Sequence, residues 1–122
     1  MNISDKDIKR STIIPAGTWV RAKVTEYEQA AANTDGSALY KYEATITGGE
    51  YDGVPVNFNF SEKAPGFAIP FLKAMGADIK AGAYDMSKPK GMDVDLFIKN
   101  KLWEGRMRNE VADYAKAGTM TA

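Results

Sequence analysis

Hydrophobic and polar residues alternate from Gly17 to Glu28, over roughly ten residues, whereas a typical strand has about 5–6. One face of this stretch is apolar and consists of Val20, Ala22 and Val24. The other face carries Trp19, Arg21, Lys23, Thr25 and Tyr27. A period of two with one apolar face is typical of a half-buried strand. A first strand of this length favours a small closed sheet, in which one strand bends and serves both halves of a barrel.

Four further segments alternate in the same way and are predicted as strands. They cover residues 39–47, 54–61, 92–99 and 106–112. Glycine-rich turn residues separate the first three strands, which predicts an antiparallel meander. Pro55 indicates an edge position for the strand over 54–61, because proline donates no backbone hydrogen bond. In the strand over 92–99, Val94, Leu96 and Ile98 are predicted to face inward.

The hydrophobic period changes between the third and fourth strands. Phe67, Phe71 and Met75 lie four residues apart, and Gly76 follows as a helix stop. This spacing predicts one short amphipathic helix that ends at Met75. Pro70 requires that the helix either begins late enough to place this residue in its first turn or kinks.

The predicted order is three strands, one helix and two strands. It indicates an all-β fold with one short helix, namely a five-stranded Greek-key barrel (OB-fold) with the helix between strands 3 and 4. Residues 14–114 would form this domain. Residues 1–13 are interpreted as an N-terminal arm, either flexible or a short helical turn, and residues 115–122 as a short tail without a structural role. The OB-fold binds ligands on strands 2 and 3 and on the loops that here cover 29–38 and 100–105; we expect the first loop to be mobile.

The composition excludes several kinds of chemistry. The chain has 122 residues and contains no cysteine and no histidine. Disulfides, zinc–thiolate sites, cysteine nucleophiles and Ser-His-Asp triads are therefore ruled out. No apolar run approaches the roughly 20 residues that span a bilayer, and the N-terminus lacks the apolar core of a signal peptide. We expect a cytoplasmic protein without a membrane partner.

Charge is balanced overall but not along the chain. Lys and Arg number 16, and Asp and Glu also number 16, so there is no global basicity. The stretch over 88–108 is locally basic: Lys88, Lys90, Lys99, Lys101, Arg106 and Arg108 outnumber Asp93, Asp95 and Glu104. Such a run is more often a solvated surface than a binding site.

Several motifs together resemble those of a family of small phage-encoded proteins. They are residues 17–20 (GTWV), 48–53 (GGEYDG), 58–61 (FNFS) and 103–111 (WEGRMRNEV). The family includes single-stranded DNA-binding proteins with an OB-fold. The resemblance implies single-stranded DNA as a partner and a role in phage DNA replication or recombination, in the cytoplasm of the host cell. Such proteins often recruit other replication proteins through an acidic tail, but residues 117–122 contain no acid, so recruitment of this kind is not expected.

Outward-facing aromatic and polar side chains are the candidate DNA-binding residues, because bases stack on aromatic rings and cations neutralise phosphates. The candidates are Trp19, Arg21, Lys23, Tyr27, Lys41, Asn57, Lys99, Lys101, Trp103, Arg106 and Arg108. Trp103 either stacks on a base or folds back as a lid on the barrel end. Trp19 and Tyr27 either contact the ligand or are covered by the N-terminal arm. Tyr40 and Tyr42 are assigned to the core.

Three functions compete at this stage. Sequence-tolerant binding of single-stranded DNA leads. The alternative is a protein-interaction or virion structural module built on an OB-type barrel. A nuclease would need a carboxylate cluster, and Asp93 and Asp95 alone do not make one, so we predict no enzyme, no catalytic residues, no cofactor and no metal site. Partner proteins are left open, and so is a homodimer.

Overall fold

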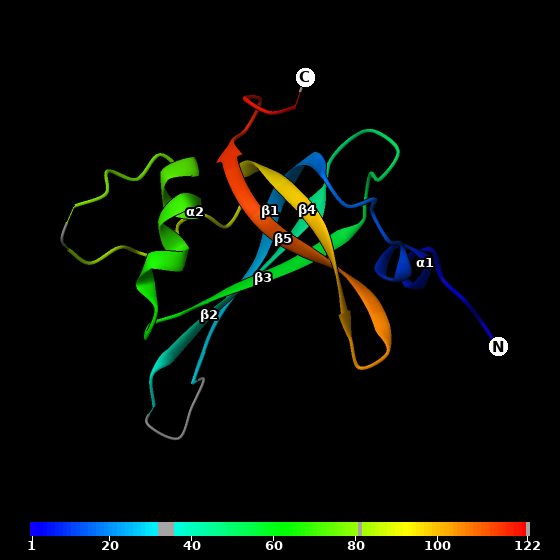
Figure 1. Ribbon diagram of the computed structural model, residues 1–122, viewed down its shortest axis with the longest axis horizontal. Helices are drawn as coiled ribbons and strands as arrows, with labels where there is room; N and C mark the ends of the chain where they lie inside the picture. The colour runs from blue at the N-terminus through cyan, green and yellow to red at the C-terminus, as the bar shows by residue number, and fades with distance from the viewer. Residues whose placement is uncertain (32–35, 81, 122) are drawn as a thin grey trace.

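A computed structural model describes residues 1–31, 36–80 and 82–121 of the chain. These residues form one five-stranded antiparallel sheet with two short α-helices (Figure 1). The strands are β1 (Thr18–Ala31), β2 (Ala38–Ile46), β3 (Pro55–Ser61), β4 (Asp93–Trp103) and β5 (Arg106–Lys116). Their order in the sheet is β3-β2-β1-β4-β5, so β3 is an edge strand, as Pro55 predicted. The prediction of a mainly β fold with five strands is confirmed.

The two ends of the sheet approach each other through side chains. Phe58 and Phe60 of β3 lie 5.3 and 5.8 Å from Tyr114 of β5, measured between ring centroids. No backbone pairing joins β3 to β5 within the described residues, so the sheet is not a closed barrel. Figure 1 shows the strongly twisted sheet with β5 crossing in front of β3.

The helix between β3 and β4 closes the core from one side. It comprises the 3-10 turn η1 (Pro65–Ala68) and α2 (Ile69–Ala74), and Pro70 lies in the first turn of α2, where its missing N–H costs little. Phe71 is 0% exposed and contacts Tyr42, Phe58, Phe60 and Tyr114 at centroid distances of 5.0 to 5.5 Å. The predicted end at Met75 is confirmed, because Met75 is the C-cap residue.

Tyr42 belongs to this aromatic core, as predicted, and Tyr40 packs against it, partly buried. The hydroxyl of Tyr42 donates to the carbonyl of Met86 at 2.7 Å. Burial raises the pKa of Tyr42 and also that of Tyr114. Both phenols therefore stay protonated and act as part of the scaffold.

A second helix forms in the N-terminal arm, for which a flexible segment and a short helical turn were the two alternatives. The helix α1 (Asp5–Ser11) begins with a capping box, in which Ser4 accepts from the backbone N–H of Asp7 and the Asp7 carboxylate accepts from that of Ser4. These hydrogen bonds lower the pKa of Asp7. The prediction of a single helix is therefore wrong. The capping signal is short, and α1 buries none of its own residues, so no apolar period marks it.

The last turn of α1 and the segment after it are docked on the sheet and on the turn between β2 and β3. The Nζ atom of Lys9 donates to the carbonyl of Asp52 at 2.7 Å, and Arg10 forms an ion pair with Glu43 at 3.1 Å. Ile14 is 0% exposed and belongs to the core. The stretch over 9–14 is therefore held at its start by Lys9 and Arg10 and at its end by Ile14. None of the helices in the described part of the chain is long and apolar enough to cross a membrane.

A β-bulge in β1 changes which side chains face the core. Val24 pairs with Ala44, and the next pair in register is Glu26 with Glu43, so Thr25 is an extra residue. One extra residue reverses the alternation that follows it. Tyr27 therefore pairs with Tyr42 on the core side, with ring centroids 5.2 Å apart. The prediction that Tyr27 faces outward with Trp19 is wrong.

Two predicted loops also differ from the structure. The predicted loop over 100–105 is wrong, because β4 continues to Trp103 and only Glu104 and Gly105 form the turn, with φ of 50° and 76°. The loop predicted over 29–38 contributes its first residues to β1 and its last to β2. Residues 32–35, on which the expectation of mobility rests, lie outside the described residues.

Candidate nucleic-acid interface

The outer face of the sheet can be defined from the pairing of β4. Val94, Leu96 and Ile98 are buried in the core, so the residues that alternate with them form the outer face. From β4 these are Asp93, Asp95, Phe97, Lys99, Lys101 and Trp103. Their cross-strand partners lie on the same face. On β1 these partners are Lys23, Arg21 and Trp19, and on β5 they include Arg108 and Arg106.

Trp19 and Phe97 form an aromatic pair on this outer face. They are direct cross-strand partners, and their ring centroids are 5.1 Å apart with the planes tilted by 46°. Both side chains are partly exposed. The prediction that Trp19 faces outward is confirmed. Phe97 was not among the candidate residues, although its alternation with Lys99 already placed it on the outer face.

A second aromatic position lies at the tip of the β4–β5 hairpin. Trp103 is 49% exposed, and the Cζ atom of Arg108 lies 4.5 Å from the centroid of its ring. This is a cation–π contact, which holds the indole on the outer face of the hairpin. The interpretation of Trp103 as a lid over the barrel end is therefore wrong.

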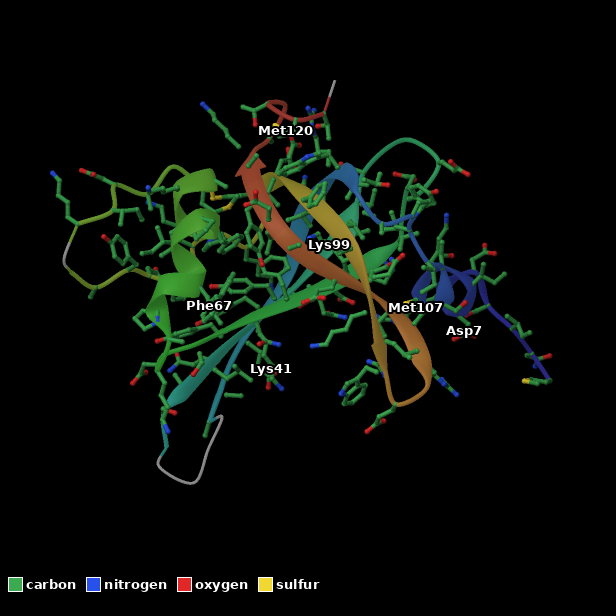
Figure 2. All side chains as sticks on the ribbon, viewed as in Figure 1. Asp7, Lys41, Phe67, Lys99, Met107 and Met120 are labelled. Atoms are coloured by element: carbon green, nitrogen blue, oxygen red, sulfur yellow. The ribbon has the colours of Figure 1, made fainter. Side chains whose placement is uncertain are left out.

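Cationic side chains lie between the two aromatic positions. Lys99 pairs with Glu110, Lys101 with Arg108, and Trp103 with Arg106. All four cations are exposed, and Lys99 is labelled on its strand in Figure 2. We call the surface formed by Trp19, Phe97, Lys99, Lys101, Trp103, Arg106 and Arg108 the hairpin face.

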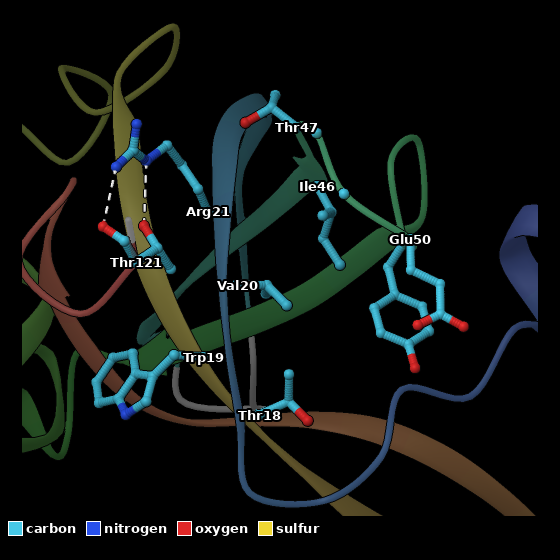
Figure 3. A pocket seen from close by; sticks show the side chains of 11 residues that line it. Thr18, Trp19, Val20, Arg21, Ile46, Thr47, Glu50 and Thr121 are labelled. Atoms are coloured by element: carbon cyan, nitrogen blue, oxygen red, sulfur yellow. Dashed lines mark hydrogen bonds between the residues drawn. The ribbon is translucent and has the colours of Figure 1, made fainter.

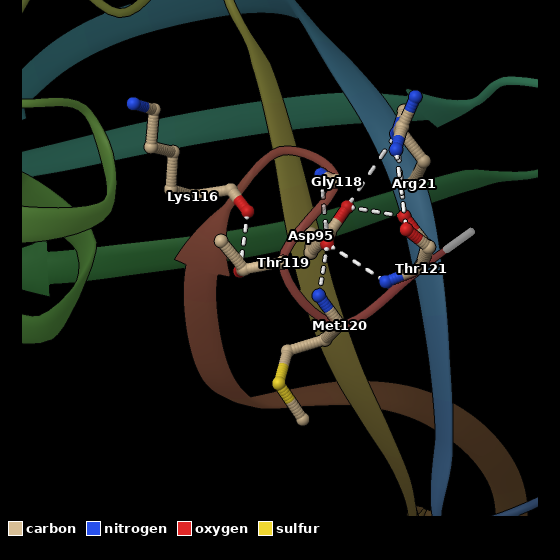
Figure 4. A network of polar contacts seen from close by, with 7 residues as sticks. All are labelled: Arg21, Asp95, Lys116, Gly118, Thr119, Met120 and Thr121. Atoms are coloured by element: carbon tan, nitrogen blue, oxygen red, sulfur yellow. Dashed lines mark hydrogen bonds and ion pairs between the residues drawn. The ribbon is translucent and has the colours of Figure 1, made fainter.

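The carboxylate of Asp95 is the centre of a polar network next to the hairpin face (Figure 4). Its Oδ2 accepts from the backbone N–H groups of Gly118, Met120 and Thr121 at 3.0, 2.9 and 3.0 Å. Its Oδ1 accepts from the Thr121 hydroxyl at 2.7 Å. Asp95 is 0% exposed, although the charged run over 88–108 that contains it is more typical of a solvated surface. The tail was misjudged, because β5 extends to Lys116 and residues 118–121 fold over this carboxylate.

Arg21 is held by the same network. Its Nε donates to the Thr121 hydroxyl at 3.2 Å and lies 3.6 Å from Oδ1 of Asp95, while one Nη donates to the Thr121 carbonyl at 3.4 Å. The guanidinium is thus largely committed within the protein, although it was predicted to contact phosphates. Burial by itself would raise the pKa of Asp95, but the hydrogen bonds from Thr121, Met120 and Gly118 together lower it. The carboxylate remains ionised at neutral pH.

The remaining predicted residues lie on the other part of the outer face. Lys41 of β2 pairs with Glu28 and with Asn59, and Asn57 of β3 pairs with Glu43. Lys23 is exposed but pairs with Asp93. The cross-strand partners of these three side chains are acidic or neutral. The structure does not bring Lys23, Lys41 and Asn57 together with Trp103.

A groove adjoins the hairpin face at its Trp19 end (Figure 3). It has a volume of about 370 Å³ and is lined by residues 18–21 of β1, residues 46–51 around the β2–β3 turn, and Thr121. In Figure 3, Trp19 and Arg21 extend to one side of β1, and Glu50 lies beyond its other side. The groove gives a ligand on Trp19 additional surface to contact.

Within residues 1–31, 36–80 and 82–121, no group of three or more acidic side chains is arranged to hold a metal ion. The chain was also compared with known proteins, and neither a protein-family model nor a curated protein matches its sequence. The resemblance to phage proteins therefore stays a prediction.

Proposed function

We propose that this chain binds single-stranded DNA with little sequence preference, through the hairpin face. The observation that carries this proposal is the placement of two aromatic positions on one sheet face with cations between them: the Trp19–Phe97 pair, and Trp103 under Arg108. An aromatic platform contributes about 1–3 kcal/mol per stacked base and tolerates any base, because every base has a π-face. Lys99, Lys101 and Arg106 would neutralise the phosphates between the stacked bases.

We further infer that the sheet is an OB-type barrel that lacks the last backbone pairing. Three features support this: the antiparallel order of the strands, the helix between β3 and β4, and the aromatic contacts of Tyr114 with β3. In such barrels the loop between strands 4 and 5 contributes to ligand binding. Here that element is the extended hairpin that carries Trp103.

The proposed contact set differs from the set predicted from the sequence. Phe97 is added, because it forms one face with Trp19. Tyr27 is removed, because it packs on Tyr42, and Arg21 is removed as a phosphate ligand, because Asp95 and Thr121 hold it. Lys23, Lys41 and Asn57 are expected to contribute little. A role in phage DNA replication or recombination rests only on the resemblance of the motifs.

Tryptophan fluorescence offers a direct test, because both tryptophans of the chain lie on the hairpin face. Titration with oligo(dT) should quench the emission, and Lys101→Gln should weaken the binding. Lys73→Gln is the matched control, since Lys73 is an exposed cation on α2, away from the hairpin. The absence of both quenching and retardation with any single-stranded oligonucleotide would contradict the proposal.

A further inference from the structure

Next to the hairpin face, β5 has an edge that faces away from β4, and no strand in the described residues pairs with this edge. β5 ends the sheet, and among the described residues only β4 pairs with it. The side chains along this edge from Arg106 to Val111 are exposed or partly exposed. In Figure 1 the hairpin extends away from the body of the sheet. An exposed strand edge of this kind is a template for pairing with another strand.

The hairpin turn determines which backbone groups point to this edge. Trp103 and Arg106 flank a two-residue turn, so they exchange backbone hydrogen bonds with each other. Hydrogen-bonding direction alternates along a strand, so Met107, Asn109 and Val111 direct their N–H and C=O groups away from β4. Among the described residues, no other segment forms backbone hydrogen bonds with these three.

We propose that two copies of this chain pair through the β5 edge, antiparallel and centred on Asn109. In this register Arg108 of each copy lies opposite Glu110 of the other, and Met107 lies opposite Val111. Opposite charges directly across an antiparallel pair are stabilising, and the two-fold axis makes every such contact twice. The three outward-directed residues then hydrogen-bond to each other across the axis.

The neighbouring registers are less favourable. Centring the pair on Arg108 or on Glu110 would place that residue opposite its own copy, and centring it on Met107 would place Arg106 opposite Arg108. Like charges directly opposite each other destabilise a strand pair. Centring it on Val111 would run into the bulge at Ala112, where the β4–β5 register shifts. The charge pattern of residues 106–111 therefore selects one register.

Exposed apolar side chains lie beside the proposed contact. Met107 is 49% exposed, and its cross-strand partner Leu102 is 66% exposed. Figure 2 shows Met107 near the hairpin tip. Pairing would cover part of this surface. The strand pair is shorter than a standard interface of about 1,600 Å², so the dimer should be weak and depend on concentration.

Pairing has a consequence for DNA binding that rests on the proposed function. A two-fold axis perpendicular to the sheet keeps both outer faces on the same side. The two hairpin faces would then form one continuous surface, with β5 of both copies at its centre. A DNA strand long enough to contact both copies raises their effective concentration, so binding to long strands should be cooperative.

Sedimentation and hydrogen exchange, both without DNA, test the dimer. As the protein concentration rises to the millimolar range, the mass should shift from 13.3 kDa towards twice that value. The amides of Met107, Asn109 and Val111 should exchange more slowly over the same range. Glu110→Arg should abolish the shift, since it opposes Arg108 of the other copy at two places, and Arg108→Glu/Glu110→Arg should restore it. Lys73→Glu, a charge change on α2, should have no effect.

A monomer throughout this range, or an equal shift for wild type and Glu110→Arg, would overturn the proposed dimer. The DNA measurement separates the two proposals. Glu110→Arg should bind an oligonucleotide that fits one copy at least as well as wild type, but should lose cooperativity on long strands. If no oligonucleotide binds, the proposed function fails, and sedimentation still decides on the dimer.

Discussion

Asn100 and Asn109 face each other across the β4–β5 hairpin and hold the backbone of Ile14 between them. The Nδ2 atom of Asn100 donates to the Ile14 carbonyl at 2.8 Å, and Oδ1 of Asn109 accepts from the Ile14 N–H at 2.8 Å. Nδ2 of Asn109 also donates to the Thr12 carbonyl at 2.9 Å. The two amides thereby fix the entry of the chain into β1 on the hairpin that carries Trp103.

Asn109→Ala should therefore destabilise the fold. The substitution leaves the N–H of Ile14 without its partner next to a buried side chain, which costs about 1–3 kcal/mol. Urea denaturation should show a lower midpoint, and the Ile14 amide should exchange faster. Asn59→Ala, at an exposed position of β3, is the matched control and should change stability by less than about 0.5 kcal/mol. Equal stability of the two variants would show that the asparagine pair does not anchor the segment.

Asp95→Asn should destabilise the protein at neutral pH. The side chain keeps its size but loses the charge that accepts hydrogen bonds from Gly118, Met120 and Thr121. Hydrogen bonds to a charged group contribute about 1.5–3 kcal/mol, so we expect a loss of that order. Asp93→Asn, on an exposed position of the same strand face, should have little effect. Residues 118–121 should become accessible to carboxypeptidase only in the Asp95 variant.

The same carboxylate makes stability depend on pH in the acid range. The pKa of Asp95 is lowered in the folded protein relative to its usual value of about 3.9. Its contribution is therefore fully present above that value and is lost as the pH falls through the folded-state pKa. Wild type should lose stability below about pH 4 more steeply than Asp95→Asn, as measured by urea denaturation at each pH. Parallel curves for the two proteins would show that Asp95 does not titrate with unfolding.

Salt should weaken DNA binding, and the size of this effect should follow the number of phosphates that cations of the hairpin face neutralise. Contacts of Lys99, Lys101 and Arg106 with about three phosphates predict a slope of about −2.1 in a plot of log K against log salt, at about −0.7 per phosphate. Lys101→Gln should reduce the slope by about 0.7. A slope near zero with intact affinity would mean that stacking alone carries the binding. Lys41 lies on β2, outside the hairpin face, so Lys41→Gln should leave the slope unchanged.

The sequence predicted the strands well where the alternation of hydrophobic and polar residues within a single segment is enough to identify a strand. Clean alternation located all five, and the aromatic spacing with Gly76 located the end of α2. It failed for Tyr27, because the bulge at Thr25 is a property of the pairing between β1 and β2. Alternation within β1 alone carries no sign of an extra residue, so Tyr27, which follows the bulge, was assigned to the wrong face.

The candidate site was predicted in part for a similar reason. The candidates included Trp19, Lys99, Lys101, Trp103, Arg106 and Arg108, and the structure brings these six onto one face. Whether Arg21 is free to contact phosphates depends on Asp95 and on residues 118–121, which are far from it in the chain. Small polar residues without an apolar period give no local signal that they will fold over a carboxylate.

Trp103 provides the sharpest test of the hairpin face. Trp103→Ala should weaken binding of oligo(dT) by about 1–3 kcal/mol, the usual contribution of one stacked base. The melting temperature should hardly change, because the side chain is 49% exposed and outside the core. Trp103→Phe keeps an aromatic face for the base, so it should restore most of the affinity.

Phe67→Ala is the matched control for Trp103→Ala, because Phe67 is an aromatic residue, 76% exposed, on η1 and away from the hairpin (Figure 2). It should leave both affinity and stability unchanged. Emission from Trp19 remains in Trp103→Ala and should still be quenched by DNA, since the Trp19–Phe97 pair is intact. If Trp103→Ala binds as tightly as wild type while the Trp19 emission is quenched, DNA follows the Trp19 end of the face and not the hairpin tip. Loss of affinity in Phe67→Ala instead would place the binding surface on the helical side of the molecule.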